Sequence, residues 1–419
     1  MSSESASSIV LDNAILWPGD GREFAGHIVV RDGRIETVGE GRFVVPPSGG
    51  IPGLARKSAP PEGGATNIVD LGGAFLSPGL IDPMLLGGFG CSVLREGPGP
   101  ILQQAARIGV TSALFCGGTV GWARNVAYAR RIREEMRDPA PNAARLFGWY
   151  PEGPFLDPKN TAALPEHAMP PTRENVRRML DEIGDTFPLI NVSPGLEGDV
   201  EAIRAFIAAG KVVSMAHSAA SVEQIGRCLE AGTSVLGHFN CNNRGRFDDE
   251  KRRVPTIEEV ALTDDRIRFI HVICDGVHTH DVLVRLCLRA RGIEHVCVVT
   301  DAQPQAGCAD GPFPADDGRT FVKAGSVART TEGRLVGSTW MLPDQFRHFV
   351  RSSGMPPRQA IRAVTLNPAT SLGLQEKLGV IATGRLADVA AWDRSLRIQR
   401  VWLGGREVSG ISALCEVKL

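Results

Sequence analysis

Residues 268–302, RFIHVICDGVHTHDVLVRLCLRARGIEHVCVVTDA, contain an apolar run, a helical stretch and a second apolar run that ends near an aspartate. Short apolar runs that alternate with longer helical stretches are typical of β/α units around a parallel sheet. The alternation starts near residue 76 and produces eight apolar runs, FLSPGLID, TSALFCG, RLFGWYPEG, FPLINVSPG, KVVSMAHS, SVLGHFN, RFIHVICDG and HVCVVTDA. Eight parallel strands predict an α/β fold of the TIM (β/α)8 barrel type.

The two ends of the chain carry a different pattern, in which short runs alternate apolar and polar residues. Residues 8–39 hold two such runs around Asp32-Gly33, a dipeptide that favours a hairpin turn. After a helical stretch at 342–372, LGVIATGRLADVAAWD and IQRVWLGGREV return to strand alternation. We predict a small β-sandwich domain from residues 7–75 and 380–419, a barrel domain from residues 76–379, and a flexible insertion at 45–66, which is rich in Pro, Gly and Ser.

The composition excludes several classes of protein. With 46 Lys and Arg against 47 Asp and Glu among 419 residues, the net charge is −1, so no general attraction to nucleic acid is expected. Nine cysteines without a C-x-x-C pair indicate reduced thiols rather than a disulfide framework. No apolar run is long enough for a signal peptide or a membrane span. We therefore expect a cytoplasmic protein that binds neither nucleic acid nor a membrane.

Polar side chains follow the predicted barrel strands, where the active sites of such barrels are built. These residues are Glu152, His217, His238, Asp275, His278 and Asp301. One Glu and two His from three different strands form a ligand set suited to zinc, with a fourth position left for water. Asp301 follows an apolar strand, where an unused carboxylate would be costly to bury, and we expect it to act as a base near that water.

Other readings remain open for some of these side chains. Asp275 fits the N-cap of a helix as well as it fits an active site. Five further histidines are interpreted as ordinary core or surface residues, because a lone histidine is more often structural than a ligand. They are His27, His271, His280, His295 and His348.

At these positions the sequence resembles the amidohydrolase superfamily, and within it the N-acetylglucosamine-6-phosphate deacetylases. The motifs that carry the resemblance follow one another along nearly the whole chain. They are PGLID at 78–82, EGPFLDPK at 152–159, VVSMAHS at 212–218, GHFN at 237–240, CDGVHT at 274–279, VTDAQPQAG at 299–307, GSTWM at 337–341, and TLNPATSLGL with LGVIATGRLADVAAWD near the end. The E-G-P, D-G-x-H and T-D-A-x-x-A-G elements are more specific to the deacetylase branch.

The resemblance implies roles for individual residues. A single tightly held divalent metal, most simply zinc, would be bound by Glu152, His217 and His238. Asp301 would be the catalytic base that takes a proton from the attacking water and later protonates the departing amine. His278 falls on a substrate-contacting histidine. The family also implies a homodimer in which a basic residue of one subunit reaches the pocket of the other, with Arg244 or Arg246 as candidates here.

The sequence departs from the family pattern at the second metal position and around the substrate. The superfamily's H-x-H on the first strand falls on Met84 and Leu86, which cannot bind such a cation, so we predict one metal. A loop residue that is usually His or Gln aligns with Leu164, and His167 is a possible substitute. Trp340, where the family commonly has Leu, either shapes the acyl pocket or simply packs.

A third departure lies after His238, where CNNRGRFDDEKRR replaces the usual phosphate-binding segment. Candidate anion-binding residues here are Asn240, Asn242, Arg244 and Arg246. A charged loop of this kind is also commonly just solvated.

Three functions are compatible with these features. The first is a metal-dependent deacetylase that hydrolyses the acetamide of an N-acetylated amino sugar, by default N-acetylglucosamine 6-phosphate. The second is an amidohydrolase acting on a different N-acylated amino sugar, for example an unphosphorylated or nucleoside-linked one. The third is a catalytically silent barrel protein, although a silent protein has no physical need to bury this ligand set.

Overall fold

The computed structural model describes residues 8–44, 67–117, 120–160, 165–239, 246–247, 250–316 and 318–410. Within these ranges, eight short strands run parallel to their neighbours and are the strands of the predicted barrel. They are β6 (Leu80–Leu85), β9 (Val110–Gly117), β10 (Arg145–Pro151), β11 (Leu189–Asn191), β12 (Val212–Met215), β13 (Val235–Leu236), β16 (Phe269–Ile273) and β17 (Val296–Val299). The predicted (β/α)8 barrel is confirmed.

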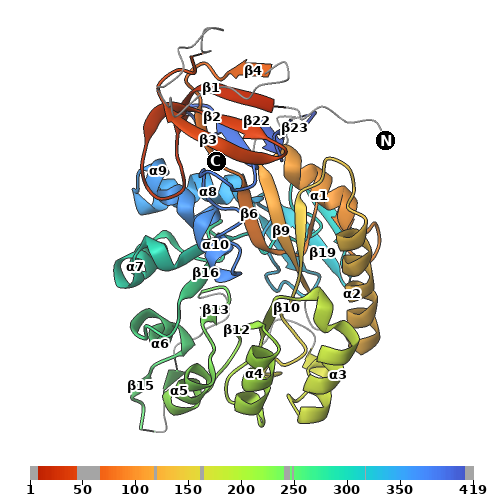
Figure 1. Cartoon of the computed structure of the whole chain (residues 1–419). Coiled ribbons are helices and arrows are strands. Elements are labelled where there is room, and N and C mark those ends of the chain that lie inside the picture. Colours follow the sequence, from red (N-terminus) through yellow and green to blue (C-terminus); the bar gives the residue numbers. More distant parts are fainter. Residues whose placement is uncertain are drawn as a thin grey trace.

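A helix follows each of these strands and covers the outside of the barrel (Figure 1). The helices are α1 (Pro98–Arg107), α2 (Trp122–Arg137), α3 (Arg173–Ile183), α4 (Asp199–Ala208), α5 (Val222–Ala231), α6 (Ile257–Thr263), α7 (Asp281–Arg291) and α8 (Leu342–Ser353). Two shorter helices, α9 (Pro357–Ala360) and α10 (Leu366–Ser371), complete the helical stretch predicted at 342–372. None of the helices in the described ranges combines the length and the apolar character that crossing a membrane requires.

The last strand of the barrel returns to the first. The backbone N–H of Asp301 donates to the carbonyl of Met84 at 2.9 Å, and the N–H of Leu86 donates to the carbonyl of Ala302 at 2.9 Å. Strand side chains alternate between two apolar layers, because successive residues of a strand point to opposite faces. Ile270 and Val272 pack outward against the helices, whereas Phe269 and Ile273 pack inside the barrel.

Both ends of the chain contribute to one small β-domain, as the sequence predicts (Figure 1). Its sheet contains β1 (Ser8–Leu16), β2 (Phe24–Arg31), β3 (Arg34–Glu40), β4 (Asn67–Asp70), β5 (Phe75–Pro78), β21 (Val389–Trp392), β22 (Ile398–Leu403) and β23 (Arg406–Glu407). The β2–β3 hairpin turns at Asp32 and Gly33, whose φ angles of 50° and 75° fit the predicted turn. The insertion predicted at 45–66 lies outside the described residues.

One predicted strand is wrong in its extent. The run FLSPGLID belongs to two sheets, because β5 pairs with β1 and β21 of the small domain while β6 pairs with β9 of the barrel. Gly79 lies between them, where a Cβ atom would stand 2.1 Å from the hydroxyl oxygen of Thr111. The close approach of Thr111 therefore requires glycine at the crossing. The domain division itself stays a prediction.

Several smaller elements were not predicted from the sequence. They are the antiparallel sheet of β18 (Gly311–Pro314), β19 (Thr320–Ala324) and β20 (Val327–Thr330), and the pairs β7 (Gly87–Gly88) with β8 (Cys91–Ser92) and β14 (Arg246–Phe247) with β15 (Arg253–Val254). Short 3₁₀ turns occur at η1 (Pro165–His167), η2 (Gly184–Thr186), η3 (Ile293–His295) and η4 (Ile361–Val364). The β18–β20 sheet is inserted between the last barrel strand and α8.

Candidate metal centre and active site

Glu152, His217 and His238 meet at the carboxyl ends of the barrel strands. One ligand atom of each lies within 4.8 Å of the others. The Nε2 atoms of His217 and His238 stand 2.5 and 3.0 Å from the same Oε1 atom of Glu152. Two imidazole nitrogens and one carboxylate oxygen at this spacing fit a zinc-type cation by their chemistry. The three side chains that the sequence placed on different strands are therefore brought together.

Backbone hydrogen bonds between neighbouring strands position these residues. The N–H of Glu152 donates to the carbonyl of Gly117 at 2.9 Å, which ties the end of β10 to the end of β9. The N–H of Phe239 donates to the carbonyl of His271 at 2.7 Å and so holds the segment after β13 against β16. The cluster thus rests on the strands rather than on a mobile loop.

Three of the strand-end residues adopt a left-handed backbone. The φ angles are 51° at His217, 23° at His238 and 51° at Asp301. Such angles cost a non-glycine residue on the order of 1–3 kcal/mol and concentrate at functional sites.

The charges of the cluster are strongly coupled. Burial acts to raise the pKa of Glu152, but the charges and hydrogen bonds of His217 and His238 outweigh it and hold that pKa well below its ordinary value. Burial likewise opposes the charge on His238, yet Glu152 raises the pKa of this imidazole. These opposite shifts follow from the close approach of one carboxylate to two imidazoles.

Asp301 follows β17 and is within electrostatic reach of the cluster. Its backbone carbonyl accepts from the N–H of Ser338 at 2.9 Å. Burial raises the pKa of Asp301 to about 7; the charge of Glu152 acts in the same direction, and His238 opposes it. A carboxyl with a pKa near neutrality can both accept and return a proton, as the base expected here must do.

Asp275 is the partner of His278. Its Oδ1 accepts from the backbone N–H groups of Val277 and His278 at 2.9 and 2.8 Å, and its Oδ2 lies 2.7 Å from the Nδ1 of His278. Asp275 does not cap the following helix, because His280 occupies the N-cap of α7 and accepts from the N–H of Val282. Of the two interpretations left open by the sequence, the N-cap is therefore wrong.

The first barrel strand presents no second cluster of ligands. The Met84 side chain is buried in the apolar interior and Leu86 packs against it. Asp82, two residues before Met84, is buried and accepts a 2.5 Å hydrogen bond from the hydroxyl of Thr300. Burial raises the pKa of Asp82 to about 6.

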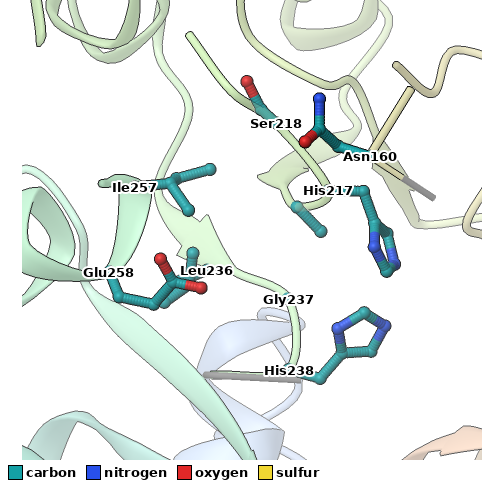
Figure 2. A pocket seen from close by; sticks show the side chains of 9 residues that line it. Asn160, His217, Ser218, Leu236, Gly237, His238, Ile257 and Glu258 are labelled. Atoms are coloured by element: carbon teal, nitrogen blue, oxygen red, sulfur yellow. The ribbon is translucent and has the colours of Figure 1, made fainter. Parts of the chain in front are cut away.

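A small pocket adjoins the cluster (Figure 2). The residues that line it are Asn160, Ala216, His217, Ser218, Leu236, Gly237, His238, Ile257 and Glu258. Asn160 is held by Asp157, whose Oδ2 accepts from the side-chain amide at 2.6 Å. Glu258 was missed in the sequence. The only signal was the T-x-x-E pattern at 256–259, which marks a helix start and says nothing about a pocket.

The predicted substrate residues that the structure describes are not among the residues that line this pocket. His167 is partly buried beside Gly121, and it does not line the pocket. Trp340 is buried with its ring edge against His348 of α8, at a centroid distance of 5.6 Å, which fits the packing interpretation. The backbone of Arg246 lies in β14. The other candidates, Leu164, Asn240, Asn242 and Arg244, and the side chain of Arg246 lie outside the described residues.

A barrel with a small β-domain and a Glu-His-His cluster at its strand ends is the architecture of a barrel hydrolase. The profile of the Amidohydrolase family matches residues 172–408, which is more than half of the chain. The chain belongs to the amidohydrolase family, whose members are metal-dependent. The resemblance that the sequence motifs indicate is therefore confirmed.

Comparison with individual relatives shows which kinds of amidohydrolase this chain is similar to. The N-acetylgalactosamine-6-phosphate deacetylase of Escherichia coli is 31% identical over 80% of this chain and 88% of its own length. The crystal structure of N-acetylglucosamine-6-phosphate deacetylase from Pasteurella multocida aligns with a TM-score of 0.81 at 22% identity, covering 96% of this chain and 99% of that one. A variant of the Mycobacterium smegmatis N-acetyl-D-glucosamine-6-phosphate deacetylase, in complex with N-acetyl-D-glucosamine-6-phosphate, aligns with a TM-score of 0.80 at 25% identity, covering 96% and 99%.

Proposed function

We propose that this protein is a metal-dependent deacetylase that hydrolyses the acetamide of an N-acetylated amino sugar, with N-acetylglucosamine 6-phosphate as the default substrate. The observation that carries the proposal is the convergence of Glu152, His217 and His238 beside Asp301, in a chain whose relatives are named as deacetylases of this sugar class. The 31% identical relative makes the galactosamine isomer the first alternative substrate.

Glu152, His217 and His238 would hold one divalent ion, and we propose zinc. Such an ion supplies Lewis acidity, which polarises an amide carbonyl and makes a water molecule a stronger acid. The buried Met84 in the strand that carries a second metal site in the superfamily supports a count of one.

In this proposal Asp301 is the residue that transfers the proton. Its carboxylate accepts a proton from the attacking water and later delivers it to the nitrogen that departs as the amine. A serine-type triad would be unnecessary, because a bound ion would supply the acidity that makes water a nucleophile. In this proposal His278, whose Nδ1 lies 2.7 Å from Oδ2 of Asp275, contacts the sugar.

The test is release of free amine from purified, metal-loaded protein. N-Acetylglucosamine 6-phosphate, its galactosamine isomer and both unphosphorylated sugars are supplied separately, with Asp301→Asn as the matched control. We expect release from at least one phosphorylated sugar that depends on metal and is lost in the control. No release above the control from any of the four sugars contradicts the proposal and returns the silent barrel protein as the leading interpretation.

We further propose a cytoplasmic homodimer. The support is the resemblance to the deacetylase family together with the absence of a disulfide among the seven cysteines within the described residues. Sedimentation velocity tests the dimer directly, since a single species at the mass of one chain contradicts it.

A further inference from the structure

Glu258 places a carboxylate in the wall of the pocket beside the metal cluster. It is the second residue of α6 and is only 7% exposed. Figure 2 shows its side chain directed inward from α6, on the side of the pocket opposite His217, with Ile257 beside it. A buried carboxylate in a pocket wall needs an explanation, because removing an ionised group from water is costly unless it is paired.

The start of α6 does not require this side chain. Thr256 is the N-cap, and Glu259 completes the capping box by accepting from the backbone N–H of Thr256 at 2.8 Å. Glu259 also pairs with Arg253 at the surface. Glu258 accepts the hydroxyl of Thr256 at 2.9 Å on Oε2, and no lysine or arginine among the described residues forms an ion pair with it. The cap and the pocket are therefore served by two different, adjacent glutamates.

A pocket carboxylate that forms no ion pair with lysine or arginine favours some ligand groups over others. It accepts hydrogen bonds and has none to donate when ionised, so it favours hydroxyl and ammonium groups. Burial raises the pKa of Glu258, so its charge depends on pH. In its ionised form the carboxylate repels a phosphate, since like charges at close range are costly away from water. His217 and His238, two of the three clustered residues, line the same pocket as Glu258.

We propose that Glu258 is a specificity-determining residue that accepts a hydrogen bond from a hydroxyl or amino group of the amino sugar and keeps phosphate away from this wall. The inference rests on the proposed function and names the part of the substrate that faces α6. A phosphorylated substrate must then direct its phosphate to another side of the site.

The kinetic test compares Glu258→Gln with Glu259→Gln, which alters the neighbouring capping carboxylate, a residue that shares the Thr256 hydroxyl but does not line the pocket. In each, kcat/KM is measured for N-acetylglucosamine and for its 6-phosphate. We expect Glu258→Gln to raise the preference for the phosphorylated sugar by about tenfold, through loss of a charged acceptor and of its repulsion. Glu259→Gln should leave the preference within about twofold of wild type. An unchanged preference in Glu258→Gln, with turnover intact, overturns the inference and leaves the proposed function standing.

A binding measurement distinguishes failure of the inference about Glu258 from failure of the proposed function. Calorimetry with glucosamine, an ammonium-bearing sugar, requires no turnover. We expect Glu258→Gln to weaken its binding by about tenfold while Glu259→Gln does not. If wild-type protein fails to bind glucosamine, or Glu258→Gln binds it equally well, the role of Glu258 is wrong whatever the catalytic result. Glu258→Asp, which retains the charge on a shorter side chain, provides a second variant should Glu258→Gln fail to fold.

Discussion

The Oδ2 atom of Asp275 lies 2.7 Å from the Nδ1 atom of His278, and Oδ1 of the same carboxylate accepts two backbone N–H groups. Burial disfavours a charge on the imidazole, but Asp275 outweighs it and raises the pKa of His278. A buried carboxylate thus sets both the orientation and the charge of the histidine expected to contact substrate. This arrangement matches the general way in which an imidazole is fixed through its second nitrogen.

Asp275→Asn should impair substrate binding rather than metal binding. The amide can keep the backbone hydrogen bonds but loses the charge that stabilises the protonated His278, so we expect KM to rise and kcat/KM to fall by about tenfold. Metal content should stay at the wild-type value. Asp281→Asn is the matched control, because it breaks another Asp–His pair, with His348 at 2.8 Å, whose residues do not line the pocket. Equal losses in both variants would show that the effect is merely structural.

Metal content should depend on the three clustered side chains. We expect about one equivalent of zinc in wild type by elemental analysis after dialysis, and near zero in His217→Ala or His238→Ala, because each removes one of three protein ligands. His280→Asn serves as the control, since asparagine can retain the N-cap of α7 at a histidine outside the cluster. Two equivalents in wild type would contradict the single-ion prediction.

Asp301→Asn should abolish turnover without emptying the metal site. Loss of a general base typically costs about 10²–10⁴-fold in rate. Burial raises the pKa of Asp301 to about 7, and a bound cation would favour the carboxylate and so lower that pKa. Activity should therefore fall as pH decreases through a value below 7, where the base becomes protonated. A kcat/KM profile whose acidic limb lies above pH 7 would exclude this assignment.

Asp82 should make the stability of the protein depend on pH. Its pKa is about 6 when folded against 3.8 ordinarily, so the folded state holds the proton over this interval while the unfolded state has lost it. Stability should then fall as pH rises from about 4 to 6, by an amount on the order of 3 kcal/mol. Urea unfolding of Asp82→Asn should lack this decline.

Thr300→Val provides a second test of how Asp82 makes the stability depend on pH, because it should enlarge the decline that Asp82→Asn removes. Removing the hydroxyl that donates to the carboxylate at 2.5 Å raises the pKa of Asp82 further, so the decline should extend to higher pH. A wild-type stability that increases across the interval, or an Asp82→Asn profile identical to wild type, would show that Asp82 does not carry the effect.

The barrel and its metal cluster were predictable because both follow from local order along the chain. Alternating apolar runs mark the strands, and the closing of parallel strands into a barrel brings their carboxyl ends together. Glu152, His217 and His238 each directly follow such a run, so their convergence required no knowledge of the loops. Asp275 could not be assigned in the same way, because an aspartate before a helix has two local uses.

The amino-acid sequence by itself determined the succession of strands and helices, the β-domain built from both ends, and the ligand types at the strand ends, since these depend on neighbouring residues and on repeated patterns. Only the tertiary structure decided that the chain changes sheets at Gly79, that Asp275 orients His278, and that Glu258 rather than Glu259 enters the pocket. Each of these depends on packing between segments far apart in the chain. Adjacent residues at the start of a helix point their side chains in different directions. The local sequence pattern does not show which of these directions leads into a pocket.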